Sequence, residues 1–137
     1  MNPSGVLLDT GPIVALLSKD DAEHERAERL FADCAPPFRC CEAVLAEACF
    51  LMKKVHPAAP AEVIALGRKG VFEISFSLPD HWTEIERVLR KYANRPISLA
   101  DACLIRCADV HQEERILTFD SDFRVYRWNK NRKFHLL

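Results

Sequence analysis

No window of the 137-residue sequence approaches the roughly 18 uninterrupted apolar residues that a transmembrane helix needs. The first 17 residues are apolar, but they contain no basic residue, Asp9 interrupts them, and no small-residue cleavage site follows. These absences argue against a membrane protein and against a secretory signal peptide. We therefore expect a cytoplasmic protein that has no membrane partner.

The six cysteines include no Cys-x-x-Cys pair. Without a secretory signal, reduced and buried thiols are expected in place of disulfides. Cys103 and Cys107 lie four residues apart on an expected helix, but a zinc site needs two further ligands at suitable spacing. We therefore assign the cysteines to the core.

The chain also lacks internal repeats, low-complexity segments and a recognisable linker. Hydrophobic residues make up 49% of it and charged residues 28%, which is enough to bury a core and excludes a disordered chain. At this length we expect residues 1–137 to form a single domain.

The formal net charge of −1 hides an uneven distribution. From Arg124 to the C-terminus there is no acidic residue. The basic residues of this stretch are Arg124, Arg127, Lys130, Arg132 and Lys133. A solvated tail is the ordinary explanation of such a run, and contact with phosphate groups is the alternative.

Apolar strand-like runs alternate with helical patterns, which is typical of a parallel sheet flanked by helices. The expected strands are 5–9, 38–40, 71–76, 115–119 and a final edge strand at 134–137. The expected helices are 13–18, 21–34, 42–55, 60–69, 79–92 and 99–110. The pattern therefore predicts the α/β class with a mainly parallel central sheet.

Four carboxylates lie where solvated side chains are not expected. Asp9 and Asp120 each follow an apolar strand-like run, and ligands of open α/β sheets bind beyond the carboxyl ends of the strands. Glu47 and Asp101 have mainly apolar neighbours three and four positions away on their helices. Because a buried acid is costly unless it is paired or metal-bound, four of them suggest a shared cation.

Both helical acids also have an ordinary explanation. Asp101 lies three residues after Ser98, which is the place of an acidic capping-box residue. Glu47 could instead pair with Lys53, Lys54 or a partner chain.

A set of carboxylate ligands suits Mg²⁺ or Mn²⁺. One or two such ions activate water for attack on phosphorus, and the absence of a phosphate-binding loop favours phosphodiester hydrolysis over nucleotide-driven transfer. The segment Asp9-Thr10-Gly11 also resembles aspartic proteases, but those are all-β and no second copy of the tripeptide is present. A haloacid-dehalogenase-like phosphatase would need an acid at position 11, where glycine stands.

Four segments resemble the motifs of PIN domains and follow the order of that family. They are Val6–Pro12, Leu45–Ala48, Ser98–Ala102 and Leu117–Phe123. The segment Phe123–Arg127 also resembles the ending of PIN-domain toxins of the VapC type. The resemblance implies a Rossmann-related three-layer α/β/α sandwich and a magnesium- or manganese-dependent endoribonuclease. It also implies a homodimer and, for the toxin branch of type II toxin–antitoxin pairs, a cognate antitoxin.

The resemblance assigns roles residue by residue. The acids that match the family's catalytic and metal-binding positions are Asp9, Glu47, Asp101 and Asp120, with Asp122 at the edge of the site. Thr10 and Thr118 match hydroxyl positions that support a carboxylate or a metal-bound water, although plain turn and strand roles explain them equally well.

Further positions lie at the periphery of the matched site. Asp21 and His24 match a feature near its mouth, where His24 is better explained as a surface histidine than as a base. Arg124 and Arg127 are the candidates for contact with an RNA substrate. The alternative function is a non-catalytic PIN-fold module that binds RNA or protein, although all four acids are present.

Overall fold

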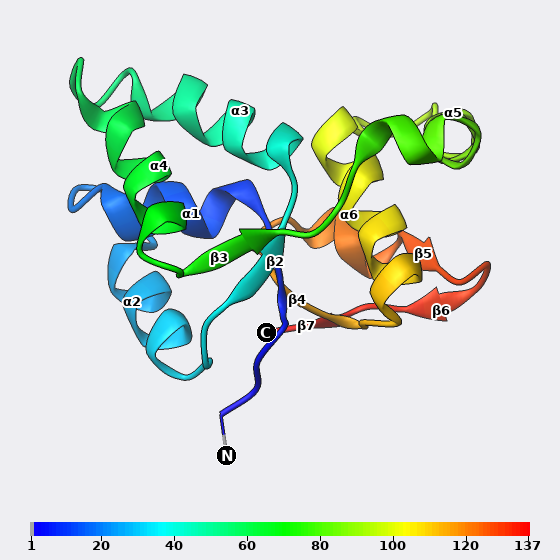
Figure 1. Cartoon of the computed structure of the whole chain (residues 1–137), viewed down its shortest axis with the longest axis horizontal. Coiled ribbons are helices and arrows are strands. Elements are labelled where there is room, and N and C mark those ends of the chain that lie inside the picture. Colours follow the sequence, from blue (N-terminus) through cyan, green and yellow to red (C-terminus); the bar gives the residue numbers. More distant parts are fainter. Residues whose placement is uncertain (1) are drawn as a thin grey trace.

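A five-stranded parallel sheet forms the centre of the molecule (Figure 1). The structure is a computed structural model, and it describes residues 2–137. The strands are β1 (Leu7–Leu8), β2 (Phe38–Cys40), β3 (Phe72–Ile74), β4 (Arg115–Leu117) and β7 (His135–Leu136), in the spatial order β3-β2-β1-β4-β7. Strands β2 and β3 extend the sheet from one side of β1, and β4 and β7 extend it from the other. The chain therefore changes direction between β1 and β4, where doubly wound sheets open a crevice at their carboxyl edge.

Helices cover both sides of this sheet, which confirms the expected α/β/α arrangement. On one side in Figure 1 lie α1 (Thr10–Leu17), α2 (His24–Ala32), α3 (Glu42–Met52) and α4 (Ala59–Arg68). On the other side lie α5 (Trp82–Lys91) and α6 (Leu99–His111), and the short 3₁₀ turns η1 (Leu78–His81) and η2 (Ser121–Arg124) complete the helical elements. No helix within residues 2–137 is long and apolar enough to span a bilayer.

Helix α1 begins at Thr10, three residues earlier than expected. The Asp9 side chain caps it by accepting a hydrogen bond from the Thr10 amide, and Pro12 fits the first turn because no partner is needed there for its missing N–H. Helix α3 ends at Met52, before the expected end at Val55.

The final edge strand forms as expected, but the segment before it contains a hairpin that the sequence did not predict. Strands β5 (Arg127–Trp128) and β6 (Arg132–Lys133) pair antiparallel. Their turn holds Asn129 and Lys130 at positive φ angles of 45° and 71°. Hairpin turns of this kind favour glycine at the second position, so a lysine there gives no turn signal.

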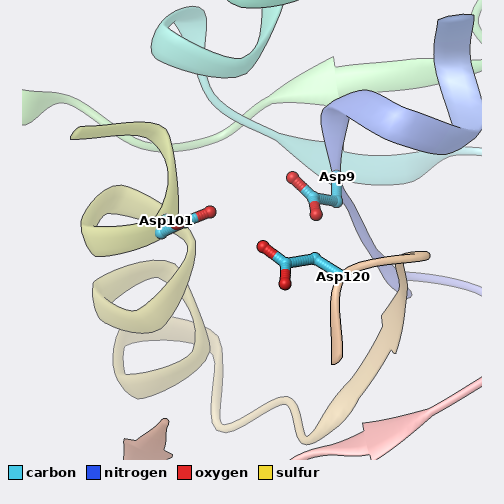
Figure 2. Close-up of side chains that lie close together, drawn as sticks. All are labelled: Asp9, Asp101 and Asp120. Carbon is cyan, nitrogen blue, oxygen red and sulfur yellow. The ribbon is translucent and has the colours of Figure 1, made fainter. Parts of the chain in front are cut away.

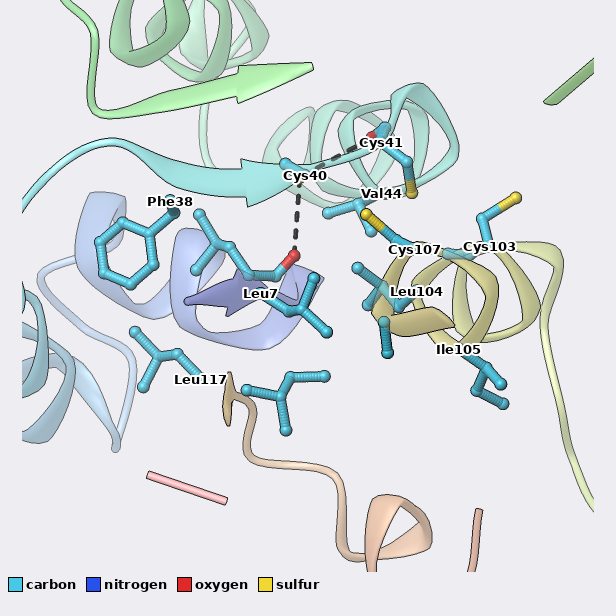
Figure 3. Packing of buried hydrophobic residues seen from close by; sticks show 14 of the residues in the cluster. Leu7, Phe38, Cys40, Cys41, Val44, Cys103, Leu104, Ile105, Cys107 and Leu117 are labelled. Carbon is cyan, nitrogen blue, oxygen red and sulfur yellow. Dashed lines mark hydrogen bonds between the residues drawn. The ribbon is translucent and has the colours of Figure 1, made fainter. Parts of the chain in front are cut away.

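The core packs side chains of the sheet against α3 and α6 (Figure 3). Four of the cysteines, Cys40, Cys41, Cys103 and Cys107, lie in this layer as free, buried thiols, in agreement with the core assignment. The Cys40 thiol donates to the Leu8 carbonyl at 3.5 Å and so links β2 to the residue that precedes Asp9. This hydrogen bond therefore anchors the end of β1, directly before Asp9, to the neighbouring strand β2.

Candidate active site

Three carboxylates meet at the crevice between β1 and β4. Asp9 follows β1 directly, Asp120 comes three residues after β4, and Asp101 lies in the first turn of α6. One oxygen from each lies within 4.8 Å of the others, and Figure 2 shows the three side chains directed toward a common space. The fold thus gathers acids that are up to 111 positions apart in the sequence.

Two hydrogen bonds, one from a backbone amide and one from a hydroxyl group, fix the orientation of Asp9. Its Oδ1 accepts the Thr10 amide at 2.8 Å and its Oδ2 accepts the Thr118 hydroxyl at 2.6 Å. The same Thr118 hydroxyl accepts a hydrogen bond from the Asp120 amide at 3.0 Å. Thr118 is buried and therefore couples the end of β1 to the residue that presents Asp120.

We expect Thr118→Val to weaken Mn²⁺ binding by roughly tenfold to a hundredfold, because partners of metal ligands typically contribute that much. Valine keeps the shape but removes the donor to Asp9 and the acceptor for the Asp120 amide. Calorimetric titration with Mn²⁺ measures the change, and Thr118→Ser, which keeps the hydroxyl, is the matched control. Equal affinity in the valine variant and the wild type would contradict the role given to this hydroxyl.

The capping-box explanation of Asp101 holds alongside its place in the cluster. The Ser98 hydroxyl accepts from the Asp101 amide at 3.0 Å, and Asp101 Oδ2 accepts from the Ser98 amide at 3.1 Å. Within residues 2–137, no donor reaches the other carboxylate oxygen of Asp101. The cap therefore orients the side chain and leaves one oxygen for a ligand.

Glu47 lies beside the three-carboxylate cluster but is not part of it. Its Oε2 accepts the Thr10 hydroxyl at 2.9 Å, and it lines the same pocket of about 400 Å³ as the three aspartates. The sequence argument for its burial was wrong, because Phe50 and Leu51 are 71% and 37% exposed and Glu47 is only half-buried. No ion pair with Lys53 or Lys54 forms among the described residues.

Burial and mutual repulsion shift the titration of the clustered acids. Burial raises the pKa of Asp9, hydrogen bonds from Thr118 and Thr10 partly offset this, and repulsion by Asp120 adds to it. Burial, then repulsion by Asp9, raises the pKa of Asp101 to about 6.

No basic side chain within the described part of the chain pairs with these acids. Within residues 2–137, none of the ion pairs involves Asp9, Glu47, Asp101 or Asp120. Two unit charges about 4.8 Å apart repel by on the order of 3 kcal/mol at an effective dielectric constant of 20. A proton or an external cation must balance such a group. Its donors are carboxylate oxygens, which fit a hard divalent cation, and the pocket leaves room for the waters that such an ion keeps.

Asp122 belongs to a neighbouring ion pair. Its Oδ1 lies 3.3 Å from the Arg95 guanidinium, and it is not one of the three clustered carboxylates. Sequence reasoning missed Arg95, because the two partners are 27 positions apart and neither lies in a recognisable pattern. Pro96, the next residue, lines the acidic pocket, whereas Arg95 does not.

Tyr126 lies near the same acids. Its hydroxyl is buried and has no hydrogen-bond partner within residues 2–137. Burial raises the pKa of Tyr126, and the charges of Asp101, Asp122 and Asp120 raise it further. The phenol is therefore neutral at physiological pH.

The two arginines that were expected to contact RNA lie outside the acidic pocket. One guanidinium nitrogen of Arg127 donates to the carbonyls of Arg124, Val125 and Tyr126 at 2.9 to 3.1 Å, and Arg127 does not line the acidic pocket. Arg124 is exposed on η2.

The two candidates at the mouth of the site hold the start of α2. Nδ1 of His24 lies 2.7 Å from the Ala15 carbonyl, and Asp21 accepts the Glu23 amide at 2.8 Å. Neither residue lines the acidic pocket.

A further wall of the pocket was not foreseen from the sequence. Phe119 lines it, and the guanidinium of Arg26 lies over the Phe119 ring at 4.6 Å from its centre. Arg26 also donates to Glu23 at 3.1 Å, which holds it over the ring.

Comparison with known proteins agrees with this geometry. No curated protein sequence matches the chain significantly. Among solved structures, VapC20 of Mycobacterium tuberculosis, described as a toxin that cleaves the sarcin–ricin loop, matches with a TM-score of 0.80 at 23% identity. The match covers 88% of this chain and 93% of VapC20, and it shows that the two share a fold. The sequence model of the PIN domain matches residues 6–129, and the chain therefore belongs to the PIN-domain family.

Proposed function

We propose that this protein is a divalent-metal-dependent endoribonuclease of the VapC type, which hydrolyses phosphodiester bonds in RNA. The observation that carries the proposal is the cluster of Asp9, Asp101 and Asp120 at the crevice between β1 and β4. An uncompensated group of acids on a rigid base would be selected against in a purely structural protein, because each buried charge costs stability.

We assign the carboxylates of the pocket to metal binding. Asp9, Asp101 and Asp120 would hold Mg²⁺ or Mn²⁺, with Glu47 completing the site from α3 and Asp122 at its edge. When bound, such an ion lowers the pKa of a water and offsets the negative charge of the phosphate.

The hydroxyl groups position the acids. Thr118 fixes Asp9, and Thr10 fixes Glu47, so each acid is held in one orientation before the substrate arrives. Arg26, held over Phe119, supplies a cation near the mouth of the pocket for a phosphate oxygen.

The substrate and partners follow from the family likeness. Since VapC20 is described as cleaving the sarcin–ricin loop, structured ribosomal RNA is the first substrate to test. We further propose a cytoplasmic toxin neutralised by a cognate antitoxin, and a homodimer. Exposed apolar side chains such as Phe50, Ile64 and Trp82, at 71%, 56% and 64% exposure, fit burial in such assemblies.

The test incubates the purified protein with ribosomal RNA and with end-labelled RNA hairpins, in Mg²⁺, Mn²⁺ or EDTA. We expect discrete cleavage products that require the metal and disappear in Asp9→Asn. RNA that binds equally well in all conditions and is never cut would favour the non-catalytic binding module. Cleavage that persists in EDTA would rule out the metal-dependent mechanism.

A further inference from the structure

A second concave site lies away from the acidic pocket, between α5, the second half of α6 and the β5–β6 turn. Its volume is about 370 Å³. The charged residues that line it include Glu84, Arg87, Lys91, Arg106, Asp109 and Lys130. None of these residues has a role in the function proposed above.

One of the two acids of this cavity is already neutralised. Asp109 accepts a hydrogen bond from the Arg106 guanidinium at 3.4 Å through Oδ2 and one from the Asn129 amide through Oδ1. Glu84 keeps its charge, because the His81 nitrogen that lies 4.0 Å from it accepts a hydrogen bond from Arg106. A single free acid does not cancel the remaining cations that line the cavity.

Besides Arg127, which donates to three backbone carbonyls, three cations of the cavity remain unpaired. Arg87, Lys91 and Lys130 form no ion pair among the residues that the structure describes. Lys91 Nζ donates to the Lys130 carbonyl at 3.5 Å, which ties the end of α5 to the hairpin turn. A concave surface with an excess of unpaired positive charge concentrates the field and attracts anions.

The position of Lys130 is conformationally costly. Its φ of 71° lies in the left-handed region, where a non-glycine residue typically costs about 1 kcal/mol or more. The turn thus places a lysine at the rim of the cavity where glycine would be the more stable choice.

The segment after α5 leads from this cavity to the acidic pocket. Arg87 and Lys91, four residues apart on α5, line the cavity, and Pro96, five residues after Lys91, lines the acidic pocket. From Asp101 to Asp109 along α6, the axial distance is about 12 Å.

A single aromatic pair separates the two sites. Tyr92 lines the cavity and packs edge-on against Tyr126 at 4.9 Å between ring centres. Tyr126 in turn lies close enough to Asp101 and Asp120 to feel their charge. The two sites are therefore neighbours in the fold.

We propose that the cavity forms a basic track, defined by Arg87, Lys91 and Lys130, that binds phosphate groups of the RNA strand flanking the bond cut at the acidic pocket. The inference rests on the proposed nuclease function. Unpaired cations gathered in a concave site next to an acidic catalytic pocket fit the phosphate backbone of a strand that contacts both sites. An acidic protein segment is the competing occupant, and the test below separates the two.

The test compares two triple variants of the full chain. Arg87→Gln, Lys91→Gln and Lys130→Gln remove the track. Lys54→Gln, Arg68→Gln and Lys69→Gln remove three exposed, unpaired cations from the α3–α4 side, so both variants change the net charge equally. Anisotropy with a fluorescein-labelled 20-nucleotide RNA hairpin in EDTA gives the affinity over a range of salt, a poly-glutamate peptide serves as the acidic protein probe, and thermal melts check folding.

We expect the track variant to bind the hairpin at least about tenfold more weakly at physiological salt. The slope of the logarithm of the binding constant against the logarithm of the salt concentration should become shallower by about 2, since three phosphate contacts are lost and each contact on a single strand contributes about 0.7. The control variant should change neither. Equal losses in both variants, or no loss in either while the wild type binds RNA, would overturn the basic track. So would a track variant that keeps its RNA affinity and loses only the peptide.

A separate cleavage assay with magnesium keeps this inference distinct from the proposed function. If the wild type cuts RNA and the track variant binds it normally, only the basic track is wrong. If the wild type neither binds nor cuts RNA, the nuclease proposal and the basic track fall together.

Discussion

We expect Asp9→Asn to lower RNA cleavage by at least about a thousandfold, because it removes a proposed central ligand and its charge from the site that we propose to hold the divalent ion. Asparagine keeps the Oδ1 acceptor for the Thr10 amide. The Thr118 hydroxyl can rotate to accept from the new amide group, since a hydroxyl both donates and accepts. The hydrogen bonds that shape the site therefore survive while the charge does not.

The same change should raise the melting temperature of the metal-free protein by a few degrees. Burial and the neighbouring acids raise the pKa of Asp9, so its ionised form destabilises the fold until a cation binds. Scanning calorimetry in EDTA measures the shift, and Asp20→Asn, an exposed acid outside the pocket, is the control with the same change in charge. A melting temperature that drops by many degrees, or cleavage that persists in Asp9→Asn, would contradict the role given to this carboxylate.

The metal-free protein should lose stability as the pH rises from about 4 to 7. Burial raises the pKa of Asp101 in the folded state to about 6, above its ordinary value of 3.8, so the folded state binds more protons than the unfolded state between these values. The stabilising contribution is therefore complete below pH 4 and is lost as the pH rises through 6. The Glu113 carboxylate, whose pKa the Arg115 guanidinium lowers, acts in the opposite direction but only below its ordinary value of 4.5.

Denaturant titrations in EDTA between pH 4.5 and 8 measure this trend. Added Mn²⁺ should restore the lost stability above pH 6, where the carboxylates are free to bind it. Asp101→Asn keeps an oxygen acceptor for the Ser98 amide and should flatten the pH dependence. If the stability of the wild type in EDTA increases with pH over this range, the raised pKa of Asp101 in the folded state is contradicted.

The sequence located the site where local patterns and topology coincide. Asp9 and Asp120 were found because each follows an apolar strand, and neighbouring parallel strands at a switch point bring such residues together. Asp101 was found because its neighbours on the helix are mainly apolar and because it lies at the start of α6, which points to the same edge.

Other features depend on packing that local patterns do not encode. Counting apolar neighbours of Glu47 could not reveal that Phe50 and Leu51 face solvent, because the sequence does not say which face of α3 packs. The pair of Arg95 with Asp122 and the glycine-free β5–β6 turn carry no local signal either.

The basic C-terminal stretch shows what a charge run leaves open. The run was recognised, but it does not reveal that Arg127 uses one guanidinium nitrogen to hold three backbone carbonyls of the preceding turn. Both Arg127 and Lys130 line the basic cavity, where Lys130 accompanies Arg87 and Lys91 of α5. Only the folded chain brings those three together.

Calorimetric titration of the metal-free protein with Mn²⁺ at pH 7.5 addresses the central inference most directly, with Asp9→Asn and Asp120→Asn run in parallel. If the clustered carboxylate oxygens share one ion, the wild type should bind Mn²⁺ saturably, and each variant should bind it at least about tenfold more weakly. A wild type that takes up no Mn²⁺, or variants that bind it as tightly as the wild type, would mean that the three acids at the β1–β4 crevice do not form a metal centre.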